Sequence, residues 1–590
     1  MDSLKQNPFS VQTPEGMSAS ETIELFVDLF SDYPNVEKSG HTFLHGPRGS
    51  GKSMLFRFMA PDCQTLSRKV HLSALPYLGV YASIKATDLN LSEFARLKDK
   101  FAELILAEHA MVVFFGAKTL LAVSQAISVE SATEERNKEI LSFCSSIRKR
   151  LKQAGWHNDN VRIDSLDDLI PIFDELYSNT VSYLRAVAFT GNSLPYSGVL
   201  LGFHDFLLPL FSDLMDLRCM PNGPVFLMVD DADNLSEKQT EVLNTWVSSR
   251  STKSVCLKIA SQMTYKTFRT VNGGRIEAPH DFSEVNIGSI YTSTKDRYQN
   301  WVHEIVAKRL SLANIAASPE EFFPEEHEQE KAINAIAQDI KKTWPELGKG
   351  YRPNDDAYRY ARPEYIKGLK GTTKQGSTYR YAGFNQIVHI SSGVIRHFLE
   401  AASLMYGEQK KRLEGQVVCI EPLVQHQVLK DLANSFMMDD FDRMAQDEQS
   451  DSSAIGKVQR LKNLVSAVGG MFHKILVSDM AERRVFSFAL SDAVDNDVKN
   501  VLDLGVQYGY FYESTIGNKE STGRTRLYVL SRRVAPFFLL DPTGFSGYKF
   551  VTNSFLREAM LRPKTTLSRI DSQGLDAAIQ SSQGDLFGQE

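Results

Sequence analysis

The sequence predicts an α/β fold in which a mostly parallel, five-stranded sheet is followed by helices and a small mixed domain. Three observations support this prediction. Short apolar runs alternate with segments of helical periodicity, a glycine-rich turn joins the first run to a helix, and a later apolar run ends in a cluster of aspartates. Strands that alternate with helices form parallel sheets, because each crossover helix returns the chain to the edge at which the strand began.

Composition limits the alternatives. The chain has 590 residues, more than one hydrophobic core can organise, so we expect roughly two to four domains. Hydrophobic residues make up 42% and charged residues 23%, a balance typical of folded proteins and not of disordered ones. The net charge of -6 excludes a strongly basic protein that coats nucleic acid, so any nucleic-acid contact must be local.

The cysteines show no metal-ligand spacing, and we expect them to be reduced. They are Cys63, Cys144, Cys219, Cys256 and Cys419. The N-terminus lacks the basic and apolar blocks of a secretion signal, which predicts a cytoplasmic protein. The most apolar run, Met111–Ile127, contains Lys118 and Gln125, so we expect a buried helix there and no membrane contact.

Residues 1–40 are expected to form a lead-in, in which Ser18 caps a helix that continues to Phe30. His41–His45 is the first predicted strand and Leu78–Ile84 is the second. Both are short apolar segments bounded by turn residues or polar residues, as strands in such folds are.

A glycine-rich turn with the pattern GxxxxGK[ST] lies between the first strand and the predicted helix Ser53–Met59. In this setting, glycines let backbone N–H groups approach phosphate oxygens, and the helix N-terminus adds partial positive charge. Lys52 is predicted to reach the β- and γ-phosphates, and Ser53 to bind Mg²⁺. The predicted nucleotide-binding residues are Gly46, Pro47, Arg48, Gly49, Ser50, Gly51, Lys52, Ser53 and Met54.

The apolar run Val225–Val229 is the third predicted strand, and acidic residues follow it. Asp230 can hold the Mg²⁺ shell, and Asp231 can orient the attacking water. No [NT]KxD motif, which reads guanine, stands near a strand end, so ATP is favoured over GTP. The predicted cofactors are therefore ATP and Mg²⁺, and the predicted activity is ATP hydrolysis. We find no separate nuclease, protease or deaminase pattern.

Residues 41–300 form the predicted P-loop core. Helical periodicity dominates from about residue 92 to residue 215, which predicts a large helical insertion between the second and third strands. Ser254–Ala260 and Glu284–Ile290 are the fourth and fifth predicted strands.

A helical lid domain is predicted over residues 301–450. Its expected helices are Trp301–Leu310, Glu328–Trp344 and Gly393–Tyr406. Before the last of these, Tyr351–Tyr381 interleaves tyrosines with arginines and lysines. This stretch is either a loop whose tyrosines pack against the helical domain or a surface that stacks on bases and neutralises phosphates. Both interpretations remain open.

The acidic segment Met438–Ser453 predicts a domain boundary. Over residues 451–562, a helix (Asn496–Leu504) is followed by two strands (Tyr510–Ser514 and Arg524–Leu530), an order that resembles a winged helix. Basic residues in and behind its wing could contact DNA phosphates. The helix expected to act as the recognition helix offers only Lys499 among aspartates, so DNA and protein partners both remain open. The wing residues are Lys519, Arg524 and Arg526, and Arg532 and Arg533 follow just behind the wing.

The last segment, residues 563–590, is rich in Ser, Gln, Gly and Asp, and we expect a disordered tail. Within it, Gln583, Leu586 and Phe587 resemble the short peptides by which bacterial proteins bind the sliding clamp. The clamp is therefore one expected partner.

Together these motifs resemble those of the AAA+ ATPases of the origin-recognition clade and of the related STAND ATPases, many of which serve bacterial signalling or antiviral defence. The resemblance implies a polar sensor after the fourth strand and a lid-helix arginine near the γ-phosphate. Ser261 or Gln262 matches the first sensor, and Arg396 matches the second. An arginine finger that acts in trans is also implied, for which Arg269 and Arg275 are the candidates.

The resemblance further implies a function: an ATP-binding, slowly hydrolysing switch that forms homo-oligomers and controls an effector protein or a DNA or RNA complex, in antiviral defence. Asp231 stands where many members have glutamate, and its shorter side chain favours slow hydrolysis. Two alternatives remain open. One is a DNA-binding loader or architectural ATPase that uses the winged helix, and the other is a nucleotide-stabilised scaffold without turnover.

Overall fold

The computed structural model divides into two compact units. The P-loop unit comprises Gln12–Gly288, and the C-terminal unit comprises Ser289–Glu590 together with Met1–Val11. The residues that the structure describes are 6–28, 33–84, 94, 97, 100–128, 133–158, 160–190, 194–249, 252–262, 265–288, 295–347, 353–369, 379–447, 456–480, 482–517, 524–543 and 547–581.

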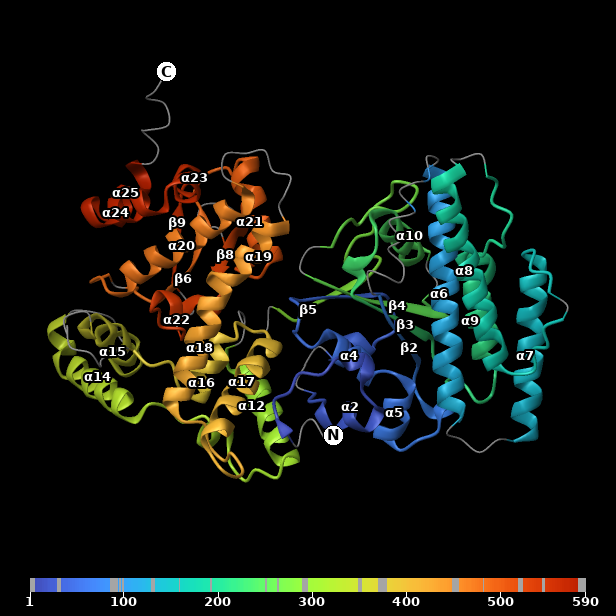
Figure 1. The fold of residues 1–590 in the computed structure, drawn as a ribbon, viewed down its shortest axis with the longest axis horizontal. Helices are drawn as coiled ribbons and strands as arrows, with labels where there is room; N and C mark the ends of the chain where they lie inside the picture. Colours follow the sequence, from blue (N-terminus) through green and yellow to red (C-terminus); the bar gives the residue numbers. More distant parts are fainter. Residues whose placement is uncertain are drawn as a thin grey trace, which may run out of the picture. The chain divides into compact units, whose positions relative to one another are not determined.

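A five-stranded, parallel sheet forms the centre of the P-loop unit (Figure 1). The strand order is β2-β3-β4-β1-β5, so the strand that leads into the P-loop lies between β4 and β5. The strands are β1 (Thr42–His45), β2 (Leu78–Ser83), β3 (Val225–Asp230), β4 (Val255–Ser261) and β5 (Ser283–Asn286). The five predicted strands and the parallel sheet are confirmed, although β5 ends earlier than predicted.

Helices cover both faces of this sheet, because alternate residues of each strand point to opposite sides. Val225, Leu227 and Val229 of β3 belong to a buried cluster that also contains residues of α6 and α10. Gly79 of β2 faces the other side, where Met59 lies at the end of α4. The helices are α4 (Lys52–Phe58), α5 (Pro61–Arg68), α6 (Lys100–Ser128) and α10 (Glu237–Ser248).

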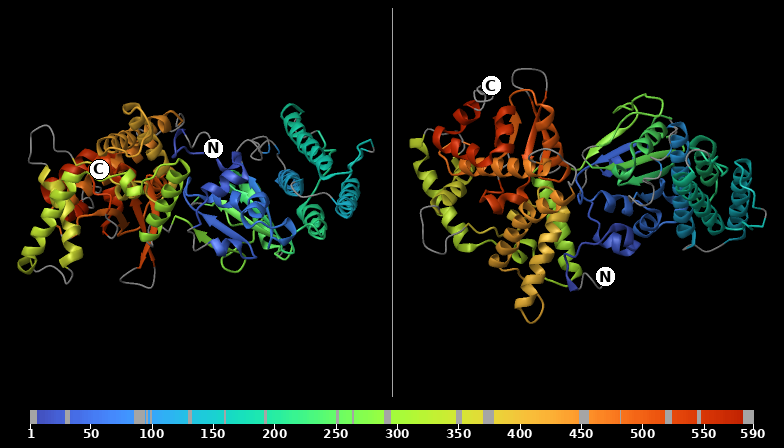
Figure 2. Two further views of the ribbon diagram at one scale, coloured as in Figure 1. Left: turned by 90° about the horizontal axis from the view of Figure 1, so that it is seen from below. Right: turned by 45° about the horizontal axis from the view of Figure 1, so that its top comes forward.

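The predicted helical insertion is present, and its first helix packs directly on the central sheet. α6 packs against β2 and α10, and it also runs beside α8 (Figures 1 and 2). The other helices of the insertion are α7 (Glu134–Gln153), α8 (Leu166–Thr190) and α9 (Leu208–Met215). By length and composition, Phe101–Ser128 could cross a membrane, but 61% of its most apolar window is buried inside the protein. Packing against the sheet therefore accounts for this apolar run.

Ser18 caps the N-terminal helix as predicted. Its hydroxyl accepts a hydrogen bond from the Glu21 N–H at 3.3 Å, and the Glu21 carboxylate accepts one from the Ser18 N–H at 3.0 Å. The helix, α2 (Ala19–Leu25), ends before the predicted Phe30. At Phe26 the backbone is extended and the ring stacks on Phe58 of α4 at a centroid distance of 3.9 Å. Tertiary packing here outweighs the local helical pattern. A short helix, α3 (Tyr33–Glu37), precedes β1.

The C-terminal unit combines a helical region with a second, four-stranded sheet in the order β7-β8-β6-β9. Its helices are α12 (Lys295–Leu312), α13 (Pro319–Phe322), α14 (His327–Leu347), α15 (Pro353–Leu369), α16 (Phe384–Ile390), α17 (Ile395–Arg412), α18 (Pro422–Met437), α19 (Asp439–Asp447), α20 (Lys457–Leu476), α21 (Asn496–Gln507), α22 (Ala535–Phe538), α23 (Asn553–Leu561), α24 (Pro563–Gln573) and α25 (Leu575–Ser581). Its strands are β6 (Val485–Leu490), β7 (Phe511–Gly517), β8 (Arg524–Leu530) and β9 (Gly547–Val551).

The described part of the tyrosine-rich stretch is mostly helical. Most of it forms α15, which pairs with α14, and Tyr379 is buried in the same unit. Arg362 donates to the Tyr379 hydroxyl at 2.6 Å and to the Glu330 carboxylate at 2.9 Å. These side chains form an internal network, which favours the packing interpretation for them. Tyr351, Arg352, Lys370 and Lys374 lie outside the described residues.

In the C-terminal unit, α21, β7 and β8 follow one another in the predicted order. The two strands pair in antiparallel fashion. The sequence did not predict β6 and β9, which complete the sheet. Arg532 is 3% exposed and donates to the Pro542 carbonyl at 2.9 Å, so the expectation that it contacts phosphate is wrong. Its guanidinium lies over the ring of Phe486 instead.

Arg533 is likewise engaged within the unit, since its guanidinium lies 3.9 Å from the centroid of the Phe436 ring. Arg526 is largely exposed and pairs with Glu513 at 3.3 Å. Lys499 is exposed at the surface of α21. Lys519 and the side chain of Arg524 lie outside the described part of the chain.

One further expectation near the C-terminus, the disordered tail, needs correction. The tail is helical as far as residue 581, in α24 and α25, because Ile570, Leu575 and Ile579 bury their side chains. The acidic segment begins with α19, which packs against α18 and α20. Only residues 582–590 of the tail, including Gln583, Leu586 and Phe587, lie outside the described residues.

The close approach of α4 to β2 predicts a strong requirement for glycine at position 79. A Cβ atom there would lie 2.3 Å from the carbonyl oxygen of Met59, and a backbone oxygen cannot move away cheaply. We expect Gly79→Ala to lower the free energy of unfolding by about 1–3 kcal/mol. Urea denaturation followed through tryptophan emission measures this change, because Trp246 is buried in the same unit.

Gly407→Ala is the matched control, since a Cβ at that position meets no heavy atom within 4 Å. Alanine favours a helix over glycine by about 1 kcal/mol, so this control should be neutral or stabilising. Equal stability of Gly79→Ala and the wild type would contradict the packing described for α4.

Candidate nucleotide site

The P-loop takes its shape from glycines in positions that other residues would strain. It follows β1 and leads into α4, and Gly49 and Gly51 have φ values of 82° and 99°, a region that favours glycine. Gly46 is constrained differently, because a Cβ there would lie 2.9 Å from the Ser50 Oγ. Because these three positions are glycines, no Cβ atom at them stands in the way of a phosphate that approaches the backbone N–H groups of the turn.

Lys52 is buried at the start of α4. Its ammonium donates to the carbonyl oxygens of Gly46 at 2.6 Å and Pro47 at 3.0 Å, within the same loop. Burial lowers the pKa of Lys52, and the neighbouring Asp230 opposes that shift. Carbonyl oxygens are neutral, so they compensate the charge of the buried ammonium only in part. A negatively charged phosphate would be a stronger partner for it.

Ser50 supplies a second sign that the loop suits an anion. The side chain is 1% exposed, and its Oγ has no hydrogen-bond partner within the described residues. A buried hydroxyl without a partner is costly, and a phosphate oxygen inside the loop would accept its proton. The residues present are therefore suited to a nucleotide phosphate chain.

Asp230 is the last residue of β3, and its carboxylate is fully buried. One oxygen accepts from the Tyr81 hydroxyl and the other from the Asp231 N–H, each at 3.0 Å. Burial, and then the charge of Asp231, raise the pKa of Asp230 to about 6, and a hydrogen bond from the Ser53 hydroxyl opposes this shift. Ser53 and Asp230 are thus adjacent, and their hydroxyl and carboxylate are the oxygen ligands that Mg²⁺ prefers.

Asp231 follows in a left-handed backbone conformation, with φ 53° and ψ 41°. Aspartate tolerates this region better than most residues, but the conformation still stores about 1–2 kcal/mol of strain. Burial, and then the charge of Asp233, raise the pKa of Asp231. The strained turn places its carboxylate beside that of Asp230.

The two candidate sensor residues, Ser261 at the end of β4 and Gln262 directly after it, have different surroundings. The Gln262 backbone N–H and side-chain amide donate to the two carboxylate oxygens of Asp233 at 2.7 and 2.8 Å. Ser261 is fully buried, and its hydroxyl lies 2.9 Å from the Nδ1 of His45. Gln262 therefore joins the acidic turn, whereas Ser261 links β4 to the strand that precedes the P-loop.

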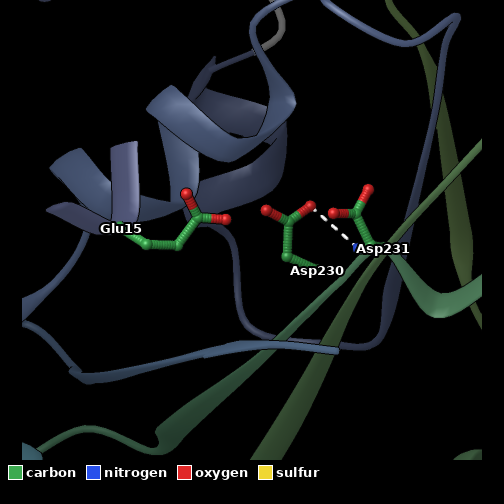
Figure 3. A group of neighbouring side chains, drawn as sticks. All are labelled: Glu15, Asp230 and Asp231. Carbon is green, nitrogen blue, oxygen red and sulfur yellow. Dashed lines mark hydrogen bonds between the residues drawn. The ribbon is translucent and has the colours of Figure 1, made fainter. Parts of the chain in front are cut away.

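Glu15 is the residue of this site that the sequence analysis missed. It lies in a short 3₁₀ turn, Pro14–Gly16, before the first helix. Single ligand oxygens of Glu15, Asp230 and Asp231 all lie within 4.8 Å of one another. The carboxyl groups of Glu15 and Asp231 both point toward that of Asp230 (Figure 3). No motif spacing marks Glu15, because it lies more than thirty residues before the P-loop.

The predicted arginines belong to other segments of the chain. Arg269 and Arg275 are exposed and face each other across a small hairpin between β4 and β5. Arg396 is exposed at the second position of α17 in the C-terminal unit. Burial lowers the pKa of the neighbouring His397, and the positive charges of Arg533 and Arg396 lower it further.

Comparison with known families agrees with this geometry. Residues 7–550 match the family described as ORC-CDC6-like. The match covers nearly the whole chain, and the chain belongs to this family, which indicates an ATPase of the AAA+ type with a P-loop nucleotide site. No curated protein matches the sequence.

The buried carboxylate of Asp230 predicts a pH-dependent stability in the nucleotide-free, metal-free protein. The pKa of Asp230 is about 6 in the folded state and 3.8 for an ordinary aspartate. The folded chain therefore binds the proton more tightly, and stability falls as the pH rises from about 4 to about 6. We expect Asp230→Asn, which mimics the protonated acid, to be more stable than the wild type at pH 7.5 by on the order of 1–3 kcal/mol.

Thermal unfolding of both proteins between pH 4 and pH 7.5 measures the effect. The difference between their midpoints should shrink toward zero as the pH approaches 4. If the wild type is more stable than Asp230→Asn at pH 7.5, the ionised Asp230 carboxylate does not destabilise the folded protein, and the prediction is wrong.

Proposed function

We propose that this member of the ORC-CDC6-like family is an ATP-dependent switch that binds ATP with Mg²⁺, hydrolyses it slowly and controls a partner. The observation that carries the proposal is the adjacency of three elements at one edge of the parallel sheet. A P-loop with a buried lysine, Lys52, and a hydroxyl, Ser53, lies beside the buried carboxylate of Asp230. Together these are the parts that hold a nucleotide triphosphate.

Each side chain has a separate task in this proposal. Lys52 leaves its loop carbonyls and neutralises the β- and γ-phosphates, while Ser53 and Asp230 hold the cation. Mg²⁺, when bound, would offset the negative charge of the phosphates and so favour attack by water. Asp231 orients that water by accepting one of its protons. Gln262 keeps Asp233 in place, so the acidic turn holds a defined conformation.

Slow hydrolysis follows from the position of Asp231. Its side chain is one methylene shorter than that of glutamate, so its carboxylate reaches less far from the backbone toward the attacking water. A switch benefits from such a site, because the ATP-bound state lasts long enough to be read by a partner. The sequence offers one nucleotide site and no second catalytic pattern, which favours a regulatory role over a metabolic one.

The partner proposal rests on the resemblance and on the exposed hairpin. We propose homo-oligomers in which Arg269 or Arg275 reaches the nucleotide of a neighbouring subunit, and control of an effector or nucleic-acid complex in antiviral defence. The alternative of a DNA loader loses support from the engagement of Arg532 and Arg533 inside the C-terminal unit. DNA is therefore included in the assays below as a potential activator.

Lys52→Ala is expected to lower ATP affinity by about tenfold or more, because a charged hydrogen bond contributes about 1.5–3 kcal/mol. Fluorescent ATP titration and phosphate release, each with and without added DNA, measure binding and turnover. Lys253→Ala, at an exposed position of the same unit, is the control and should behave as the wild type. Wild-type protein that binds no nucleotide would refute the proposed function.

Asp231→Asn should separate turnover from binding. Removing a group that orients or deprotonates water typically costs about 10²–10⁴-fold in rate, whereas Lys52 can still contact the phosphates and Ser53 the cation. We therefore expect unchanged ATP affinity and a loss of phosphate release. If Asp231→Asn hydrolyses ATP at the wild-type rate, another group positions the water.

Subunit mixing tests the trans arginine. The double variant Arg269→Ala and Arg275→Ala keeps its own phosphate site, and it should lose about 10³-fold or more in turnover, as expected for an arginine finger. Adding Lys52→Ala subunits, which lack a working phosphate site but retain both arginines, should restore part of the activity. Full activity of the double variant alone would eliminate both arginines as fingers.

A further inference from the structure

The third carboxylate of the site comes from outside the two nucleotide motifs. Glu15 is exposed on a short turn at the start of the P-loop unit, and its carboxyl group points toward Asp230 (Figure 3). One of its oxygens accepts from the Ser83 hydroxyl at 3.1 Å. Ser83 ends β2, the strand next to β3. Glu15 is thus held at the carboxyl edge of the sheet, where parallel α/β folds bind ligands.

The arrangement has an electrostatic cost that a cation would remove. Ligand oxygens of Glu15, Asp230 and Asp231 lie within 4.8 Å of one another. Like charges at this separation repel, and a divalent cation between them turns the repulsion into coordination.

Acidic residues alone would not identify a ligand site, but the neighbouring loop points to one independently. Ser50 has a buried hydroxyl without a partner among the described residues, inside the loop that precedes α4. Among the described residues, the buried Lys52 ammonium donates to the carbonyl oxygens of Gly46 and Pro47, at 2.6 and 3.0 Å. A phosphate chain would satisfy both groups, and its cation would then meet the carboxylates.

We propose that Glu15 is a ligand in the divalent-cation shell of the nucleotide site, bound to the cation directly or through one water. The proposal rests on the proposed nucleotide site and adds a residue that the P-loop and β3 motifs do not contain. Mg²⁺ keeps several waters and usually takes one or two carboxylates, so Asp230 and Glu15 suffice, and Asp231 remains available for the attacking water. The N-terminal turn thereby sets the cation affinity.

Binding of Mn²⁺ tests this role without relying on activity. Electron paramagnetic resonance counts free Mn²⁺ in titrations of the full chain, with ADP and without nucleotide. We expect Glu15→Gln to weaken Mn²⁺ binding by about tenfold or more, within the range for groups that tune a metal site. Glu15→Asp should restore part of the affinity, because it returns a carboxylate on a shorter arm.

Two comparisons separate coordination from a structural role. Ser83→Ala removes the hydrogen bond to Glu15 but leaves the carboxylate, so Mn²⁺ affinity should change by no more than about threefold. Asp230→Asn should lose Mn²⁺ binding as a positive control. Nucleotide binding measured in EDTA should be unchanged in Glu15→Gln, since its effect passes through the cation.

Equal Mn²⁺ affinity of Glu15→Gln and the wild type, with and without ADP, overturns the proposal. This failure differs from failure of the proposed function, in which the wild type itself binds no nucleotide. Because the titrations include nucleotide-free protein, the role of Glu15 is decided in either case.

Discussion

The burial of one carboxylate, that of Asp230, is the constraint around which the P-loop unit is arranged. An ionised acid without solvent is stable only when hydrogen bonds or positive charges compensate it. Here Tyr81, Ser53 and the Asp231 N–H supply the hydrogen bonds, and these groups come from three different segments. Burial nevertheless raises the pKa of Asp230 to about 6, so these hydrogen bonds do not fully offset the loss of solvent around the carboxylate.

The parallel sheet makes this meeting of segments possible. In the order β2-β3-β4-β1-β5, the P-loop strand and β3 are separated by β4, and their carboxyl ends share one edge. The same edge carries Gln262 after β4 and Ser83 at the end of β2. Gly79 allows α4 to pack closely on this sheet, because a Cβ there would lie 2.3 Å from the Met59 carbonyl oxygen.

The basic and aromatic residues of the C-terminal unit illustrate how composition can mislead. Arg362 and Tyr379 hydrogen-bond to each other within the unit, and Arg532 lies over a phenylalanine ring. In a sequence these residues are indistinguishable from a nucleic-acid surface, because both uses need cations beside aromatic faces. Burial decides between them, and burial depends on contacts between residues far apart in the chain.

The sequence by itself determined the α/β class, the five parallel strands, the P-loop, and the acidic end of β3, because each depends on local periodicity or on residue types at a fixed spacing. Ser18 was identifiable as a helix cap for the same reason. Tertiary structure alone decided the end of α2, where Phe26 stacks on Phe58, and the two added strands of the C-terminal sheet. It alone brought Glu15 to Asp230, because a side chain more than two hundred residues away in sequence meets its partner only when the sheet has formed.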